Sequence, residues 1–292
     1  LLISKQDADT MTIELKGGLY IVSTPIGNLK DLSARAIEVL ENVSFIACED
    51  TRVTGKLLFR YNIKTPMKAY HEHSAERVKD KILSAIAEDK AVAIVSDAGT
   101  PTISDPGYKL IKLCIRNNYY ISAIPGASAA ITGLVLSGIP TNRFLFFGFL
   151  SSKREKKSNE LSGLVNIPTT LIFYESPKRL VSTLQTMIKQ LGNRPAAITR
   201  ELTKRHEQVR RGQLNDLFLY YKSIPPPKGE LVLIVGGMVK KIAAVDDNLD
   251  QIIINRLKSK SLRDTSIEIS DETGITKKLV YARALALSKP KS

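Results

Sequence analysis

The sequence predicts an α/β protein made of two α/β domains and a small all-helical unit at the C-terminal end. Three observations lead to this prediction. From Gly18 onward, short apolar runs alternate with longer amphipathic stretches; the alternation breaks near residues 138–143 and then resumes; and the stretch from about residue 249 has no strand pattern. A chain of 292 residues is long enough for two ordinary domains with an appendage.

The first domain is predicted at residues 18–141. Its strands are expected in "LYIVST", "SFIACED", "AVAIVSDAG" and "YYISAIPG", and its helices in "LSARAIEVLENV", "TRVTGKLLFRYN", "SAERVKDKILSAIAED", "DPGYKLIKLCIRNN" and "ASAAITGLVLSG". Such alternation is typical of an open, mostly parallel sheet with helices on both faces. Ligands of these sheets bind at the carboxyl ends of the strands.

The same argument predicts a second α/β domain at residues 142–240. Here the expected strands are "FLFFGFL", "TTLIFYES", "PAAITREL" and "GELVLIVGG", with helices beginning at "KREKK" and "PKRLVSTLQTMIKQL". Residues 249–292 are expected to form a helical unit, because "SLRDTSIEISDETG" and "ITKKLVYARALALSK" read as two helices around a turn at Gly274. Residues 1–17 are expected to be an N-terminal extension; "LLISKQDADT" carries charges where a signal peptide needs an apolar core.

The charge of the chain favours a polyanionic partner. Lys and Arg number 43 against 29 Asp and Glu, a net charge of +14, and neutralised phosphates release counterions, so nucleic acid is preferred over an anionic membrane surface. No apolar run approaches the length of a membrane span. Cys48 and Cys114 are isolated, which argues against a zinc ribbon or a disulfide framework and suits the reducing cytoplasm.

Three glycine-containing loops follow predicted strands of the first domain. They are "STPIGNLKD", "SDAGTPTISDPG" and "IPGASAA". Gly and Pro let the backbone approach a ligand, and Ser, Thr and free amides supply hydrogen bonds, so together the loops predict a small-molecule cleft, although each alone is compatible with an ordinary turn. No GxxxxGK[ST] motif and no GxGxxG motif opens a βα turn, which disfavours kinase-like and dinucleotide-binding proteins.

Two aspartates lie in the second of these loops. Asp97 comes directly after the strand, where it can accept hydrogen bonds or face a cation. Asp105 precedes Pro106, the pattern of a helix N-cap with Pro at the first helical position. We therefore expect a functional role for Asp97 and a capping role for Asp105.

The ordered series of motifs resembles a known family. "TPIGNLKDLSARA", "EDTR", "SDAGTPTISDPG", "PGASAAITGLVLSGIPT", "FYESPKR", "TRELTK" and "GELVLIVGG" are similar to the tetrapyrrole methylase-like, class III S-adenosylmethionine methyltransferases, and most similar to the ribosomal branch of that family. The resemblance covers about residues 18–239. "TPIGN" replaces the Gly-Pro-Gly turn of the tetrapyrrole enzymes, which disfavours a porphyrinoid substrate.

The resemblance implies that S-adenosylmethionine binds in the cleft between the two α/β domains of a homodimer. It implies the following cofactor contacts: Pro25, Ser96, Asp97, Ala98, Gly99, Ser128, Ala129, Tyr174, Leu202, Gly229 and Glu230. For the ribosomal branch it also implies the reaction, which is methylation of the ribose 2′-hydroxyl of a cytidine in 16S ribosomal RNA of the small subunit.

A ribose hydroxyl is a poor nucleophile at neutral pH, so a general base or a nearby positive charge is expected. "CEDTR" offers Glu49, Asp50 and Arg52, and "YHEH" offers His71 and His73. By motif position we expect Asp50 and Arg52 to be catalytic, the alternative being a salt bridge at the strand end. No metal is expected, because the His-x-His pair has no third ligand nearby and HExxH is absent.

Basic segments suggest the RNA-binding surface. The residues expected to bind RNA are Arg143, Lys153, Arg154, Lys178 and Arg179, with Lys277, Lys278 and Arg283 in the helical unit. Further candidates are Lys156, Lys157, Lys204, Arg205, Arg210 and Arg211. Two alternatives remain open, namely a tetrapyrrole methyltransferase and a non-catalytic RNA-binding assembly factor on the same scaffold.

Overall fold

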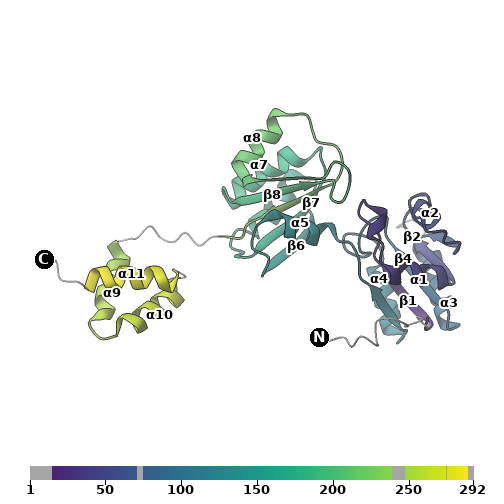
Figure 1. The fold of residues 1–292 in the computed structure, drawn as a ribbon, viewed down its shortest axis with the longest axis horizontal. Helices are drawn as coiled ribbons and strands as arrows, with labels where there is room; N and C mark the ends of the chain where they lie inside the picture. The colour runs from purple at the N-terminus through teal and green to yellow at the C-terminus, as the bar shows by residue number, and fades with distance from the viewer. Residues whose placement is uncertain (1–14, 71–74, 239–246, 274, 289–292) are drawn as a thin grey trace.

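The computed structural model describes residues 15–70, 75–238, 247–273 and 275–288 (Figure 1). The first part of the chain contains, in order, β1 (Gly18–Val22), the 3-10 helix η1 (Leu29–Asp31), α1 (Ala34–Asn42), β2 (Phe45–Cys48), α2 (Thr51–Arg60), β3 (Met67–Ala69), α3 (Ala75–Ala87), β4 (Ala91–Val95), α4 (Tyr108–Arg116), β5 (Ile121–Ile124) and α5 (Ala129–Ser137).

The first sheet is parallel throughout, with the strand order β3-β2-β4-β1-β5. Its central strand β4, with the sequence AVAIV, is buried at every position, as expected for a strand covered on both faces. Side chains of α1 and α2 pack on one face and those of α3 and α4 on the other. The predicted arrangement of this sheet is therefore confirmed.

The second part of the chain forms another five-stranded sheet with the order β6-β7-β10-β8-β9. Its elements are β6 (Phe144–Phe149), α6 (Arg154–Ser162), β7 (Thr170–Glu175), α7 (Leu180–Leu191), β8 (Pro195–Arg200), β9 (Gln208–Gln213), α8 (Leu214–Ser223) and β10 (Leu231–Val235). Helices α6, α7 and α8 supply the apolar side chains that cover one face of this sheet.

The second sheet is mixed, which the simple alternation of strands and helices did not predict. Only β6 and β7 pair in parallel, whereas β10 is antiparallel to both β7 and β8, and β8 is antiparallel to β9. The reason is the edge strand β9, whose sequence QVRRGQ is mostly exposed or half-buried. Strand β9 pairs antiparallel with β8 with no helix between them, so the chain has already reversed its direction when it enters β10.

Helix α5 follows the last strand of the first sheet but packs on the second one. Ala130 and Leu134 of α5 share a core with Ile172, Ala197 and Val232 of the second sheet. A side chain at Gly133 would lie 3.2 Å from Thr199 Oγ1, so the helix approaches this sheet closely. The boundary predicted at residue 141 stays a prediction, but α5 brings the loop after β5 against the second sheet.

The C-terminal unit consists of α9 (Asp247–Leu257), α10 (Leu262–Thr273) and α11 (Lys277–Ser288) around its own small core. Arg256 forms ion pairs with Glu268 and Glu272, and Arg283 forms one with Asp250. The helices on either side of Gly274 agree with the predicted pair, while Gly274 and residues 1–14 lie outside the described residues. None of the described helices has both the length and the apolar character needed to cross a bilayer.

Candidate cofactor site

The three predicted loops meet at the carboxyl ends of β1, β4 and β5, which are neighbours in the first sheet. Thr24 and Gly99 exchange two backbone hydrogen bonds of 2.9 and 3.0 Å, and the Thr24 hydroxyl donates to the Ser96 carbonyl at 3.1 Å. Gly99 has a φ of +81°, a conformation that side chains disfavour. The Ser23 and Thr100 hydroxyls lie 2.9 Å apart and Thr100 donates to Ala127 O at 3.4 Å, so the loops form one connected wall.

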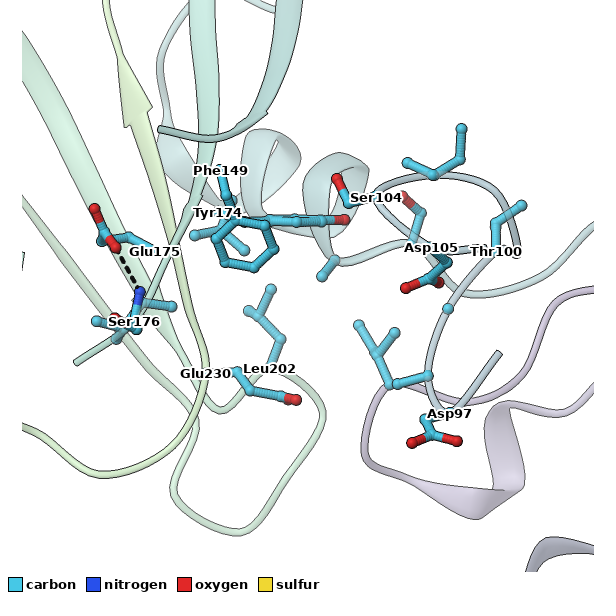
Figure 2. A pocket seen from close by; sticks show the side chains of 18 of the residues that line it. Asp97, Thr100, Ser104, Asp105, Phe149, Tyr174, Glu175, Ser176, Leu202 and Glu230 are labelled. Carbon is cyan, nitrogen blue, oxygen red and sulfur yellow. Dashed lines mark hydrogen bonds between the residues drawn. The ribbon is translucent and has the colours of Figure 1, made fainter. Parts of the chain in front are cut away.

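A pocket of about 440 Å³ lies between this wall and the second sheet, within the range typical of small-molecule sites. Figure 2 shows Asp97, Thr100, Ser104 and Asp105 on one side and residues of the second sheet on the other. Nine of the eleven residues predicted to bind the cofactor line the pocket: Asp97, Ala98, Gly99, Ser128, Ala129, Tyr174, Leu202, Gly229 and Glu230. Pro25 and Ser96 are buried behind it, and Ser96 supports the wall through its carbonyl.

The second side of the pocket is held by a charged turn. Lys204 Nζ donates to Glu201 Oε1 at 2.9 Å and to Glu230 Oε2 at 2.8 Å, and the Glu230 backbone N–H donates to Glu201 Oε1 at 3.1 Å. A side chain at Gly229, where φ is +97°, would collide with the Glu201 carboxylate at 2.2 Å. Gly229 is therefore required by both its conformation and its neighbour.

The two sides also touch directly. The Asn28 backbone N–H donates to Thr203 Oγ1 at 3.0 Å. Gly27 lies so close to Leu202, Thr203 and Lys204 that a Cβ atom there would be 2.4 to 2.9 Å from their atoms. Ile26 and Leu202, next to this contact, both line the pocket.

Asp105 does not cap a helix, so this prediction was wrong. Helix α4 begins two residues later than expected, with Gly107 as its N-cap at a φ of +127°. Asp105 instead lines the pocket. Burial raises the pKa of its carboxyl, the Ser96 hydroxyl opposes this shift, and the negative charge of Asp97 adds to it. The Asp-Pro pair in the sequence does not distinguish a helix N-cap from a residue that lines the pocket.

Asp50 and Arg52 form a close pair beside the pocket rather than in its lining. Asp50 is the N-cap of α2 and accepts from the Arg52 backbone N–H at 2.8 Å, and its carboxylate also binds the Arg52 guanidinium, with Nη2 at 2.6 Å. These contacts lower the pKa of Asp50 to about 2. The Asp50 backbone N–H donates to Asp97 Oδ1 at 3.0 Å, which connects the pair to the pocket wall.

The residues predicted to bind RNA fall into two groups. Arg143, Lys153, Arg154, Lys178, Lys277 and Lys278 are exposed. Two others are held by carboxylates. Arg179 lies 3.2 Å from Glu175 and donates to the carbonyls of Leu150 and Ser151, and Arg283 is held by Asp250.

Lys157 is buried, so its predicted place on the RNA surface was wrong. Only 4% of it is exposed, and Nζ donates to Thr183 Oγ1 at 3.0 Å. Thr183 in turn donates to the buried Glu175 carboxylate at 2.5 Å. Burial lowers the pKa of Lys157, while Glu175 raises it. Helical spacing within the basic run "KREKK" is the signal that separates this inward lysine from its exposed neighbours.

His71 and His73 lie outside the described residues. Within the described part of the chain, no three His, Cys, Asp or Glu side chains are grouped so that they could hold a metal ion.

Comparison with known proteins places the chain in a family. Residues 18–217 match the family model described as Tetrapyrrole (Corrin/Porphyrin) Methylases. A relative from Mesorhizobium japonicum named Ribosomal RNA small subunit methyltransferase I is 42% identical over 94% of this chain and 93% of its own. A relative with the same name from Rickettsia prowazekii is 43% identical over 88% of this chain and 91% of its own.

Solved structures share the fold at lower identity. A diphthine synthase superposes with a TM-score of 0.61 at 16% identity, over 75% of this chain and 89% of its own. A uroporphyrin-III C-methyl transferase from Thermus thermophilus complexed with S-adenyl homocysteine superposes with a TM-score of 0.52 at 17% identity, over 75% of this chain and 97% of its own.

The fold and the family model are those of a class III methyltransferase, an enzyme that takes its methyl group from S-adenosylmethionine. Within that class, the chain belongs to the ribosomal RNA small subunit methyltransferase I family.

Proposed function

We propose that the protein methylates the ribose 2′-hydroxyl of a cytidine in 16S ribosomal RNA, with the small ribosomal subunit as its partner. The observation that carries the substrate class is the match over nearly the whole chain to relatives named for the small-subunit RNA. The net charge of +14 supports it, because an RNA substrate requires a cationic surface. Such a substrate also implies a cytoplasmic location.

The pocket gives a second argument against a tetrapyrrole substrate. The charged residues that line it are all acidic: Glu49, Asp97, Asp105, Glu175 and Glu230. Glu175 and Glu230 are paired with cations, but Asp97 and Asp105 form no ion pair with a described residue and would repel the several carboxylates of a uroporphyrin-type tetrapyrrole. A ribose hydroxyl carries no charge and meets no such barrier.

The residues predicted to bind the cofactor fit S-adenosylmethionine. The pocket combines apolar side chains such as Ile26 and Leu202 with carboxylates, hydroxyls and the aromatic ring of Tyr174. When bound, the cofactor supplies an electrophilic methyl group. The work of the protein is then to hold the acceptor oxygen in line behind this methyl group and to exclude water.

For Asp50 and Arg52 we propose a shared role at the entrance. Arg52 is 87% exposed on its side chain and is held in place by Asp50, so its guanidinium can bind a backbone phosphate next to the target ribose. Asp50, with a pKa of about 2, is a weak base near neutral pH. In this proposal Asp50 is a positioning residue for Arg52.

The exposed cations Arg143, Lys153, Arg154 and Lys178 are proposed to bind RNA phosphates, and Lys277 and Lys278 to do so from the helical unit of residues 249–292. Arg179 and Arg283 would have to give up existing ion pairs to do the same. We also propose that the two α/β domains comprise residues 18–141 and 142–240, and that the protein is a homodimer.

The test is to incubate the protein with S-adenosylmethionine labelled in its methyl group and either small ribosomal subunits, naked 16S RNA or uroporphyrinogen. A 2′-O-methyl group blocks alkaline cleavage of the following phosphodiester, so label in an alkali-resistant cytidine dinucleotide supports the proposal. Label on a base would overturn the 2′-O assignment. Label in the tetrapyrrole would support the first alternative, and tight subunit binding without label the assembly factor.

A further inference from the structure

The five carboxylates that line the pocket differ in their partners. Glu175 has Arg179, Glu230 has Lys204, Asp97 accepts from the Asp50 backbone N–H, and Glu49 also takes part in an interaction. Asp105 accepts a hydrogen bond from the Ser96 hydroxyl, which is neutral. Within the described part of the chain, no Lys, Arg or His nitrogen lies within the 4.0 Å of an ion pair from Asp105.

Asp105 is also half-buried. A carboxylate taken out of water is normally paired with a cation or with several hydrogen-bond donors. Burial and the negative charge of Asp97 raise the pKa of Asp105, and the hydrogen bond from the Ser96 hydroxyl opposes this shift. Among the residues that the structure describes, no cation therefore balances the negative charge of Asp105 at the pocket.

Aromatic rings lie in the same pocket. The centroids of Phe149 and Tyr174 are 5.4 Å apart, and both residues line the cavity. Burial raises the pKa of the Tyr174 hydroxyl, and the negative charges of Asp105 and Glu230 add to this shift. Figure 2 shows the two rings across the pocket from the loop that carries Asp105. A carboxylate facing aromatic rings is suited to a cation.

We propose that Asp105 binds the sulfonium of S-adenosylmethionine and is the residue that distinguishes this cation from the neutral product, S-adenosylhomocysteine. The inference rests on the cofactor assigned above. The amino-acid end of the cofactor carries both charges and can be held by hydrogen bonds. A sulfonium has no N–H or O–H to donate, so carboxylates and ring faces are what the protein can offer it.

The reaction removes the charge that Asp105 balances. Transfer breaks the bond between the methyl carbon and sulfur, leaves its electron pair on sulfur, forms the carbon–oxygen bond and releases the hydroxyl proton to solvent. The sulfur is then neutral, and Asp105 is again a half-buried charge that no cation among the described residues balances. The product is consequently held less tightly than the substrate cofactor, which favours exchange after each turnover.

Calorimetric titration of Asp105→Asn tests this, because Asn keeps the shape and removes the charge. The probes are S-adenosylmethionine, S-adenosylhomocysteine and sinefungin, which carries an amine where the sulfonium stands. S-adenosylmethionine and sinefungin both carry a positive charge at this position, and we expect the variant's affinity for each to fall about tenfold or more. The affinity for S-adenosylhomocysteine should change less than about threefold. Asp80→Asn, which removes an exposed carboxylate from α3, should leave all three affinities unchanged.

Equal weakening of all three ligands in Asp105→Asn, or no weakening, would overturn the proposal. The thermal midpoint of the unliganded variant adds an independent readout, because removal of a half-buried charge that has no ion-pair partner should leave this midpoint equal or higher. Should Asp105→Asn fail to fold, Asp105→Ser is measured in the same way. Wild-type protein that binds neither the cofactor nor the product would overturn the cofactor assignment itself, a failure distinct from loss of discrimination.

Discussion

The contact across the pocket at Gly27 predicts that Gly27→Ala will damage both folding and cofactor binding. The new Cβ would stand 2.4 Å from Lys204 Cγ, 2.8 Å from Thr203 Oγ1 and 2.9 Å from the Leu202 carbonyl oxygen. The Lys204 side chain can turn away, but the Leu202 carbonyl is backbone and cannot. To reach 3.4 Å, where ordinary contact begins, the loops must separate by about half an ångström at Leu202.

Separation of the loops has two costs. Overpacking of this kind costs about 1–3 kcal/mol, and stretching the hydrogen bond from Asn28 to Thr203 costs about 1 kcal/mol. Because Ile26 and Leu202 line the pocket, the gap also removes dispersion contacts with the cofactor. We expect a thermal midpoint lower by several degrees and an S-adenosylmethionine affinity reduced about three- to tenfold.

The matched control is Gly55→Ala, measured by calorimetry and thermal denaturation beside Gly27→Ala. Gly55 lies within α2, and the nearest atom to its added Cβ is Met67 Cε at an ordinary 3.6 Å. The control should be neutral or more stable than wild type, because Ala favours a helix over Gly by about 1 kcal/mol. Gly27→Ala with wild-type stability and wild-type affinity would show that these loops do not meet in solution.

The remaining predictions concern charged groups. Lys157→Ala should lower the free energy of unfolding by about 2 kcal/mol in a denaturant titration, because it removes a buried charged hydrogen bond, and it should leave the salt dependence of RNA binding unchanged. Lys153→Ala, at the exposed start of the same helix, should leave the free energy of unfolding unchanged and reduce the salt slope of RNA binding by about one. A reduced slope for Lys157→Ala would contradict its buried position. The folded-state pKa of Asp50, about 2, lies below its ordinary value of 3.8, so its ion pair is fully formed above about pH 4 and is lost as the pH falls through 2. Asp50→Asn should therefore lower the single-turnover rate equally across pH 5 to 9, and an acid limb that disappears in this variant would make Asp50 the base after all. Arg283→Ala should loosen the helical unit, seen as faster amide exchange in α9 and α11, with little change in RNA affinity; a large loss of affinity without faster exchange would instead place Arg283 on the RNA.

The sequence was most informative where hydrophobic patterning and structure follow the same period. Strands β1, β2, β4 and β5 of the first sheet are short apolar runs in a sheet with helices on both faces, and β4 illustrates why, since AVAIV is buried at all five positions. Strands without that pattern were missed. Met67–Ala69 has three residues and QVRRGQ is an exposed edge strand rich in cations, so neither carries an apolar run that could be recognised.

The sequence predicted which loops line the pocket, but not which of the charged side chains are buried or paired. The family resemblance named nine residues that line one pocket. Five of them meet because strand ends of the parallel first sheet share an edge, namely Asp97, Ala98, Gly99, Ser128 and Ala129. Whether a charged residue is buried or paired depends on partners far away in the sequence. Lys157 is buried through Thr183 and Glu175, and no cation of the described residues forms an ion pair with Asp105.

The net charge of the chain and the charge of its pocket have opposite signs, and each sign suits one substrate. Exposed cations such as Lys153 and Lys178 attract a phosphate backbone over a range set by the salt concentration. At the pocket this attraction is reversed, because its charged lining residues are all acidic and two of them, Asp97 and Asp105, form no ion pair with a described residue. A phosphate is therefore drawn to the surface but turned away from the methyl donor, whereas the neutral ribose hydroxyl can enter. The same carboxylates attract the cationic cofactor, so one arrangement of charge separates the two ligands, and it follows that adding a lysine inside the pocket would harm both binding events at once.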